Sequence, residues 1–360
     1  MQVESGRYFE RAIGEFTSRL AEFEKTIEPL AHPDNENDLK QLGDIMQFGL
    51  DVCRQMHQAT DGDLERRRSF RKKFLDATAP WCNQSWIIHR ARSKPRGFPG
   101  DYQMLLAIYD GVPLSRGLGG YLDRWCLSMT LGKAVDSRLQ SVKSFLIEEL
   151  SRRQGPVGVL DIASGPGREF QWVRTKGIKS QVKMSCLDSD DGALEYIRRH
   201  ASKYAPPNIS FQFHQYNAMK LRKAESLIQK FGRQDIIYSV GLADYLPDRI
   251  LIPMLRCWRE SLKPEGCVYV AFKDADRYDQ VPYQWLMDWH FLERTERDCQ
   301  RLFEEAGYEA GSLAAERDAT GVILNYISRV RMPDLRRIDR EQIDRPLIRE
   351  TEATISRTAK

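Results

Sequence analysis

The chain has 360 residues, a length that predicts two domains or one large domain with an extension. Hydrophobic residues make up 41% and charged residues 29%, close to the average of soluble globular proteins, so the chain is able to bury a core. The formal net charge of +4 is too small a surplus over this length for a nucleic-acid-binding surface, and we expect no nucleic-acid partner.

The cysteine and apolar patterns exclude further classes of protein. The seven cysteines are too widely spaced to form a CxxC metal-binding pair or a disulfide framework. No apolar run approaches the roughly 20 residues that cross a bilayer, and the first residues lack the features of a signal peptide. We therefore expect a cytoplasmic protein with no metal site and no membrane span.

The first 60 residues predict a pair of antiparallel helices. Apolar residues recur every three or four positions from Phe9 to Leu30 and again from Leu39 to Met56. Packing one stripe on the other gives a helical hairpin. A coiled-coil seam between two copies stays open as the alternative and would make a homodimer through these helices. Helices over 63–79 and 81–92 follow, the first with a basic run over 66–73 that we interpret as a solvated face, anion binding being the alternative.

Residues 93–120 form a stretch rich in Pro and Gly around one short apolar helix. A flexible linker would be poor in aromatic residues, whereas Phe98, Tyr102 and Tyr109 alternate here with the turns. We therefore favour an ordered, lid-like loop that packs over a site, rather than a linker between helical parts. Phe98, Asp101 and Tyr102 are its candidate substrate-binding residues, and Asp101 is also placed to cap the helix that follows.

From residue 133 the pattern changes to alternating strands and helices, which is typical of a parallel α/β sheet. A helix is expected over 133–151, and strands over 157–162, 182–187, 208–214, 235–240 and 267–272, with a closing antiparallel hairpin from segments 308–314 and 322–330. The predicted fold class is α/β, a Rossmann-like sheet with helices on both faces, preceded by an all-α N-terminal domain. The expected boundaries are 1–132 for the helical domain, 133–333 for the α/β domain and 334–360 for a polar tail.

The strand ends carry residue types that a nucleoside ligand needs. Ligands of open α/β sheets bind beyond the carboxyl ends of the strands. The first strand ends in Asp161 and a turn in which Gly165 and Gly167 allow close approach of the backbone. The second strand ends in Asp188, a carboxylate able to accept hydrogen bonds from both ribose hydroxyls. This set alone fits a dinucleotide as well as S-adenosylmethionine.

Three features favour S-adenosylmethionine. The turn has the sequence DIASGPG rather than GxGxxG, Asn217-Ala218 follow the third strand, and Leu262-Lys263-Pro264-Glu265-Gly266 precede the fifth. In this order residues 155–332 resemble class I S-adenosylmethionine-dependent methyltransferases, which carry Asp-Ala and Leu-Lys-Pro-Gly-Gly at the last two places. The resemblance implies that the cofactor-binding residues are Asp161, Ala163, Ser164, Gly165, Gly167, Asp188, Ser189, Asn217, Ala218, Val240 and Gly241.

A narrower resemblance covers about residues 93–330. The segments RSKPRGFPGDYQML, LDIASGPGREF, DIIYSVGLADYLPDR, DWHFLERTERD and ATGVILNYI look like those of the bacterial 3-hydroxypalmitic acid methyl ester synthase grouping. That grouping methylates a fatty-acid carboxylate to make a quorum-sensing signal, which implies a small-molecule acceptor here.

The chain departs from the expected patterns at four positions. Ala163 replaces a Gly, Asn217 replaces an Asp whose role its side-chain oxygen can still fill, and His290 replaces an aromatic residue. Glu265 also replaces a Gly, and we expect its turn to avoid a left-handed residue there.

The acceptor side has fewer signals. A carboxylate acceptor is ionised at pH 7 and needs no base, whereas a hydroxyl or amine acceptor would need one. Asp244, Tyr245 and His290 are the catalytic candidates, while His214 is expected to be structural. Arg277 and Arg294 are candidates to hold an acceptor carboxylate. Trp285, Met287, Trp289 and Phe291 could line an apolar pocket, although packing of a helix is the favoured interpretation.

Two other functions stay open. One is O-, N- or C-methylation of a secondary metabolite. The other is a module that binds S-adenosylmethionine without catalysis and contacts a partner through the long N-terminal stripe.

Overall fold

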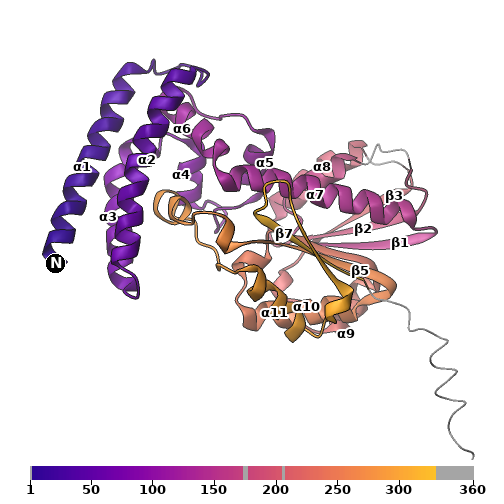
Figure 1. Ribbon diagram of the computed structural model, residues 1–360. Helices are drawn as coiled ribbons and strands as arrows, with labels where there is room; N and C mark the ends of the chain where they lie inside the picture. The colour runs from indigo at the N-terminus through magenta and orange to yellow at the C-terminus, as the bar shows by residue number, and fades with distance from the viewer. Residues whose placement is uncertain (1, 173–176, 205–206, 330–360) are drawn as a thin grey trace, which may run out of the picture.

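The computed structural model describes residues 2–172, 177–204 and 207–329, so the predicted tail over 334–360 lies outside the described residues. Seven helices come before the first strand, and a seven-stranded sheet with helices on both faces follows (Figure 1). The predicted fold class is therefore confirmed. In the described part of the chain, no helix is long and apolar enough to span a membrane.

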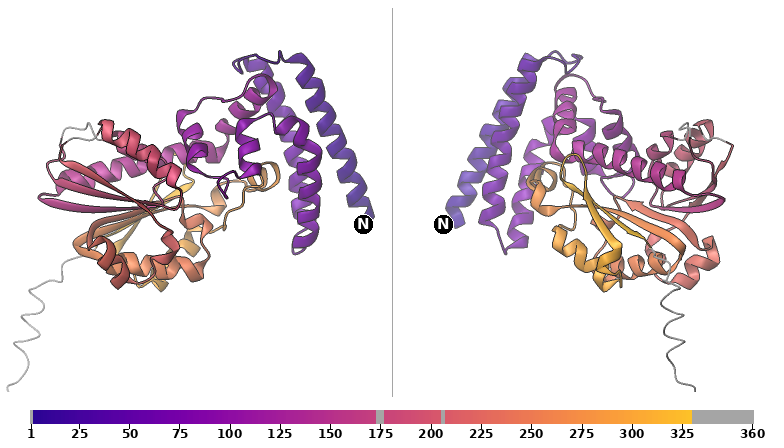
Figure 2. Two further views of the ribbon diagram at one scale, coloured as in Figure 1. Left: turned by 180° about the vertical axis from the view of Figure 1, so that it is seen from behind. Right: turned by 45° about the vertical axis from the view of Figure 1, so that its right-hand side comes forward.

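The first three helices are α1 (Gln2–Thr26), α2 (Glu36–Ala59) and α3 (Leu64–Cys82), and they stand side by side at one end of the molecule (Figures 1 and 2). Their apolar stripes pack on one another. Phe16 stacks on Phe74 with 5.8 Å between the ring centroids, and a Cβ at Gly49 would lie 2.7 Å from the Phe16 ring. The α1 stripe is thus buried within its own chain, so it offers neither the coiled-coil seam nor the partner surface that we considered. Leu30, past the end of α1, is 81% exposed.

A layer of shorter helices connects this bundle to the sheet. It contains α4 (Trp86–Ser93), α5 (Tyr102–Asp110) and α6 (Gly117–Ser128). The carboxylate of Asp123, fully buried, accepts hydrogen bonds from the Ser85 hydroxyl and from the backbone N–H groups of Ile87, Leu114 and Ser115. A buried carboxylate with every oxygen hydrogen-bonded holds the segment 111–116 in one conformation.

The sheet has the strand order β3-β2-β1-β4-β5-β7-β6, with β7 antiparallel to its neighbours and the first five strands parallel. The strands are β1 (Pro156–Ile162), β2 (Gln181–Asp188), β3 (Ile209–Gln215), β4 (Gln234–Val240), β5 (Leu262–Lys273), β6 (Leu313–Arg317) and β7 (Ile323–Arg329). The order reverses between β1 and β4, which is where such sheets bind ligands.

Helices cover the two faces of this sheet. The helices α7 (Thr130–Arg152) and α8 (Asp191–Tyr204) lie on one face, and α9 (Ala224–Phe231), α10 (Asp248–Glu260) and α11 (Glu296–Glu305) lie on the other (Figure 1). Strand side chains alternate accordingly, since Val159 belongs to the core under α7 and Leu160 to the core over α10. The first core continues without a break into the α1–α3 bundle. The helical front end is therefore packed onto the sheet through a common core.

One expectation about the backbone was wrong. Glu265, in the turn at the start of β5, has φ +60°, although we expected that turn to avoid the left-handed region. A neighbouring contact accompanies this conformation, because the Glu265 carbonyl accepts a hydrogen bond from Arg153 at 3.1 Å. The glutamate thus adopts the left-handed conformation that a Gly would adopt in this turn, and its backbone is strained there.

Candidate active site

The turn after β1 presents its backbone to the carboxyl end of the sheet. Ala163, Gly165 and Gly167 all have positive φ, at 62°, 54° and 59°. A Cβ on Gly167 would lie 2.8 Å from the Phe170 ring, so that Gly is needed for packing beneath the turn. Gly165 is different, because its Cβ position has only Leu105 near it, at 3.4 Å. Gly165 therefore keeps the backbone open toward the space above the strands.

Asp188, at the end of β2, is tied to this turn. Its Oδ2 accepts the Gly165 N–H and its Oδ1 accepts the Asp190 N–H, each at 2.9 Å. Burial raises the pKa of this carboxyl group, and the two N–H groups oppose that shift. Asn217 similarly caps the short turn after β3, since its Oδ1 accepts the Met219 N–H at 3.0 Å. Both side chains still have lone pairs for a ligand.

A cavity of about 420 Å³ opens at these strand ends. Eight of the expected cofactor residues line it, namely Ala163, Gly165, Asp188, Ser189, Asn217, Ala218, Val240 and Gly241. Asp161, Ser164 and Gly167 lie beneath the lining. Ser164 fixes the turn, because its N–H and its hydroxyl both donate to the Leu187 carbonyl.

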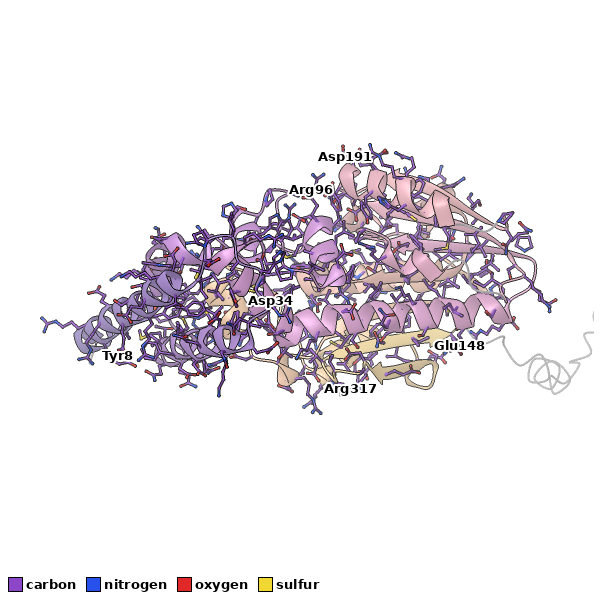
Figure 3. The ribbon with its side chains drawn as sticks, turned by 90° about the horizontal axis from the view of Figure 1, so that it is seen from above. Tyr8, Asp34, Arg96, Glu148, Asp191 and Arg317 are labelled. Atoms are coloured by element: carbon purple, nitrogen blue, oxygen red, sulfur yellow. The ribbon has the colours of Figure 1, made fainter. Side chains whose placement is uncertain are left out.

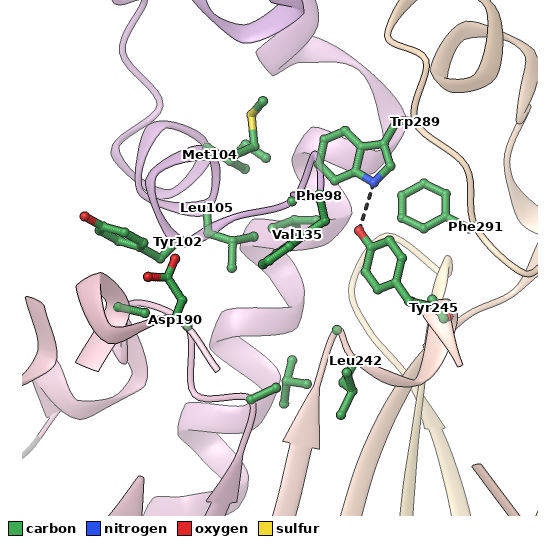
Figure 4. A pocket seen from close by; sticks show the side chains of 18 of the residues that line it. Phe98, Tyr102, Met104, Leu105, Val135, Asp190, Leu242, Tyr245, Trp289 and Phe291 are labelled. Carbon is green, nitrogen blue, oxygen red and sulfur yellow. Dashed lines mark hydrogen bonds between the residues drawn. The ribbon is translucent and has the colours of Figure 1, made fainter. Parts of the chain in front are cut away.

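The opposite side of the cavity is formed by the layer of short helices, the loop before α5 and the first turns of α7. The lining residues from this part of the chain are Ile87, Phe98, Gly100, Tyr102, Met104, Leu105, Ile108, Cys126, Leu127, Leu131, Gly132, Val135 and Arg138. All of them except Tyr102 and Arg138 present apolar side chains, a thiol or only backbone. In Figure 4 Phe98, Leu105 and Val135 face Tyr245, Trp289 and Phe291 across the cavity. The cavity thus runs from the polar strand ends into an apolar space between helices.

The loop over 93–101 closes against both walls. A Cβ on Gly100 would lie 2.9 Å from the Trp289 ring and 2.9 Å from the Tyr245 hydroxyl. Arg96 forms an ion pair with Asp190, which lines the cavity next to Asp188. Figure 3 shows Arg96 beside Asp191 at the same boundary. Phe98, Gly100 and Tyr102 therefore border the cavity that Gly165 and Asp244 also line, as the lid hypothesis requires.

The segment after β4 and the segment 281–291 form the remaining wall. Tyr245 accepts a hydrogen bond from the Trp289 indole N–H at 2.8 Å (Figure 4). Burial raises the pKa of the Tyr245 hydroxyl, so it stays protonated at neutral pH. Asp244 is buried, and its Oδ1 accepts a hydrogen bond from the backbone N–H of Lys273 at 3.2 Å. Asp244 does not cap α10. Met287, Trp289 and Phe291 line the cavity, whereas Trp285 packs on Phe9 and Phe74 in the bundle core.

Four expected acceptor residues lie elsewhere. The His290 side chain is 42% exposed and contacts Asp288 at 3.2 Å, outside the cavity lining. Arg277 is 59% exposed beside Asp274. Arg294 is buried. Its guanidinium donates hydrogen bonds to the Ala243 and Leu246 carbonyls and forms an ion pair with Asp248.

The fourth of these residues is Asp101. It is fully buried, caps α5 and pairs with Arg90, and it does not line the cavity. His214, expected to be structural, lies on β3 against Phe231 and does not line the cavity.

Two buried cations in the lining were missed from the sequence. Arg138, on α7, is 6% exposed, and its guanidinium lies about 3.0 Å from where a Cβ on Gly241 would be. Lys273 ends β5 and is 5% exposed. Arg138 follows the polar residues Asp136 and Ser137 of α7, and Lys273 follows the apolar run of β5, so the sequence carries no local signal that distinguishes either from a solvated charge.

Sequence comparison agrees with this geometry. Residues 159–266 match a family described as "Methyltransferase domain". The chain contains an S-adenosylmethionine-dependent methyltransferase domain. The match covers β1 to the start of β5, which includes the turn at Gly165, Asp188 and Asn217.

Comparison with solved structures finds one similar fold at a TM-score above 0.5 and weaker similarities below that value. A possible exported protein from Bordetella parapertussis is 20% identical, with a TM-score of 0.53 over 64% of this chain and 80% of that one. The S-adenosylmethionine-dependent methyltransferase SibL in its apo form is 19% identical, with a TM-score of 0.44 over 72% of each chain. Magnesium protoporphyrin IX methyltransferase from Synechocystis PCC 6803 with bound SAH is 11% identical, with a TM-score of 0.41 over 56% of this chain and 86% of that one. No curated protein matches the sequence significantly.

The methyltransferase cavity fits its cofactor in chemical terms. It offers an open backbone at Gly165, a carboxylate at Asp188 with unused lone pairs, and a guanidinium at Arg138. Below the lining, Asp161 is 2% exposed and its Oδ2 has no hydrogen-bond partner among the described residues. S-adenosylmethionine is the cofactor of this methyltransferase domain.

Proposed function

We propose that the protein transfers the methyl group of S-adenosylmethionine to the carboxylate of an apolar small molecule, and that a hydroxy fatty acid is this acceptor. The observation that carries the proposal is the apolar end of the cavity, which α5, α6 and α7 line with Met104, Leu127, Leu131 and Val135. A long alkyl chain fits such a lining, because its burial gains about 0.8 kcal/mol per CH₂ group.

Residues at the strand ends would hold the cofactor. Asp188 would accept hydrogen bonds from the ribose hydroxyls, and Asn217 with Ala218 would face the adenine. Gly165 would let the backbone approach the methionine part. Arg138 is placed to pair with the methionine carboxylate, because it is buried beside Gly241 at the end of β4.

The buried acids beneath the turn would complement the methionine ammonium. Burial raises the pKa of Asp161 and that of Glu169. Tyr238 donates a hydrogen bond to Glu169 at 3.0 Å. An ammonium nearby would favour the ionised form of these carboxyls, so cofactor binding and their deprotonation support each other.

The acceptor side supports a nucleophile that is already ionised. When bound, the cofactor supplies a methyl group on a sulfonium, which a nucleophile displaces in line. Among the described residues that line the cavity there is no histidine, and Tyr245 is held protonated by burial. Asp244 is the one cavity residue near Tyr245 that could accept a proton, and it is engaged by Lys273. A carboxylate needs no proton removed, so positioning and exclusion of water are enough.

The loop over 93–101 would provide that positioning. Trp289 and Tyr245 leave no room for a side chain at Gly100, and Phe98 lies over the middle of the cavity (Figure 4). A methyl sulfonium and a carboxylate react faster when water is displaced from both. We therefore propose that Phe98 and Tyr102 cover the reacting groups.

The test is a product assay with isotopically labelled S-adenosylmethionine and saturated and 3-hydroxy acids of graded chain length. The expected product is the labelled methyl ester of a long-chain acid, with no label transferred to the matching primary alcohol. Label found as an ether on the 3-hydroxyl group would favour O-methylation with Asp244 as the base. No transfer to any acid, from enzyme that binds S-adenosylhomocysteine, would refute the carboxylate proposal.

A further inference from the structure

Lys273 is the second buried cation of the cavity lining, and its contacts leave the ammonium short of partners. Its Nζ lies 3.7 Å from Asp244 Oδ1, which is too far for a hydrogen bond. The ring centroids of Phe291 and Tyr278 lie 3.8 Å and 5.4 Å from Nζ. Aromatic faces attract a cation but accept no conventional hydrogen bond from it.

Burial of an ammonium group in this environment destabilises the folded protein unless a further group accepts its hydrogen bonds. Its three N–H donors lose their water on burial, and the long ion pair with Asp244 does not replace that hydration. The half-buried Glu293 carboxylate also attracts the ammonium, since the charge of Lys273 opposes the rise that burial causes in the pKa of Glu293. Lys273 nevertheless lines the cavity with its side chain 5% exposed. The N–H donors of the Lys273 ammonium therefore face either other residues of the cavity lining or the space that the acceptor would fill.

The two cations of the lining lie at different places. Arg138 is on α7, next to Gly241 at the end of β4, where the cofactor's methionine carboxylate is expected. Lys273 is at the end of β5 beside Asp244 and Phe291, on the acceptor side. Among the described residues that line the cavity, these are the cationic side chains. A cofactor and an acceptor with one carboxylate each would use one cation each.

We propose that the Lys273 ammonium binds the carboxylate of the methyl acceptor and so selects acids over alcohols. This inference rests on the proposed function. One acceptor oxygen would bond Nζ, which leaves the other oxygen free to attack the methyl group. Asp244 attracts the ammonium from 3.7 Å, and the Phe291 ring, on which Trp289 packs, covers Nζ at 3.8 Å. The alkyl chain would then extend toward Met104 and Leu127.

The test compares Lys273→Met, which keeps the length of the side chain without its charge, with Lys273→Arg and with Lys263→Met as the matched control. Lys263 also pairs with an aspartate, Asp235 at 2.7 Å, but lies outside this cavity. Calorimetric titration with S-adenosylhomocysteine checks the fold and the cofactor site of each variant. The acid used is the one that wild-type enzyme methylates fastest among the C8–C16 saturated and 3-hydroxy acids.

Loss of a charged hydrogen bond predicts that KM for the acid rises roughly tenfold or more in Lys273→Met, with S-adenosylhomocysteine affinity unchanged. Lys273→Arg should recover part of the loss, and Lys263→Met should match wild type. Binding of the corresponding primary alcohol to the S-adenosylhomocysteine complex, measured by tryptophan fluorescence, should be equal in wild type and Lys273→Met.

The outcomes separate the two levels of the proposal. If wild type methylates acids and Lys273→Met does so with the same KM, the role of Lys273 is refuted while the proposed function stands. If wild type neither methylates nor binds any acid while it binds S-adenosylhomocysteine, the proposed function fails and this inference fails with it. Equal weakening of acid and alcohol binding in Lys273→Met would also overturn it, because the lysine would then act through packing alone.

Discussion

Replacing Asp188 by alanine should weaken cofactor binding by an amount that the contacts of its carboxylate predict. An ionised carboxylate has about four lone-pair sites. The N–H groups of Gly165 and Asp190 use two of these sites in this structure. The two that remain match the two ribose hydroxyls of S-adenosylmethionine. Asp188→Ala therefore removes the ribose contacts and also releases the Gly165 turn.

Each hydrogen bond to a charged group contributes about 1.5–3 kcal/mol, so loss of both ribose bonds should cost about 3 kcal/mol or more, roughly a 150-fold or larger increase in Kd. Calorimetric titration with S-adenosylhomocysteine measures the change. Asp191→Ala is the matched control, because its side chain is three residues along the same segment and 81% exposed. A variant Asp188→Ala that stays folded and binds with wild-type affinity would remove Asp188 from the cofactor site.

The same carboxyl predicts a pH dependence with a definite sign. Burial raises the pKa of Asp188 above its usual range, and ribose hydroxyls donate to the ionised form. Cofactor affinity should therefore fall as the pH is lowered through this raised pKa and stay constant above it. Asp188→Asn should lack this step, and an identical pH profile in wild type and Asp188→Asn would assign the titration to another group.

Three further predictions concern the loop, a strained turn and the acceptor channel. Gly100→Ala should raise KM for the acceptor and leave S-adenosylhomocysteine affinity unchanged, because the added Cβ would lie 2.9 Å from the Trp289 ring. Gly43→Ala, with open space around its Cβ, is the control. A loss of cofactor affinity in Gly100→Ala would contradict a role of the loop in covering the acceptor. Glu265→Gly should raise the free energy of unfolding by about 0.5–1 kcal/mol, since φ +60° is strained for a glutamate; a lower value in urea denaturation would show that the Glu265 side chain stabilises the turn. Cys126→Trp, at a buried position of the channel, should shift the preferred acceptor to shorter acids; an equal loss of turnover at all chain lengths would count against the channel.

The sequence predicts the sheet and the cofactor edge well because both depend on short-range patterns. Alternating strands and helices determine the fold class, and the carboxyl ends of parallel strands must lie at one edge. The residues after these strands, such as Gly165 and Asp188, were therefore expected at one edge of the sheet, and the structure brings both to the cavity there. The aromatic residues among the turns of 93–102 carried enough information to suggest a loop over the site.

The acceptor side depends on tertiary packing that the sequence does not encode locally. His290 and Arg294 lie in an irregular segment after a π-helical turn, where the direction of each side chain has no period to follow. Arg294 points into the turn at Ala243, and His290 points to Asp288. The sequence analysis did not identify Arg138 and Lys273 as site residues. Each lies in a regular element, α7 or β5, and lines the cavity only because distant elements pack around it.

The most direct test of the account is a crystal structure of the enzyme with S-adenosylhomocysteine and hexadecanoic acid bound together. We expect the alkyl chain to lie between α5, α6 and Trp289, the carboxylate to lie beside Lys273, and one of its oxygens to face the cofactor sulfur. An acid bound with its carboxylate away from the sulfur, or a cavity that the cofactor and the walls fill completely, would contradict it.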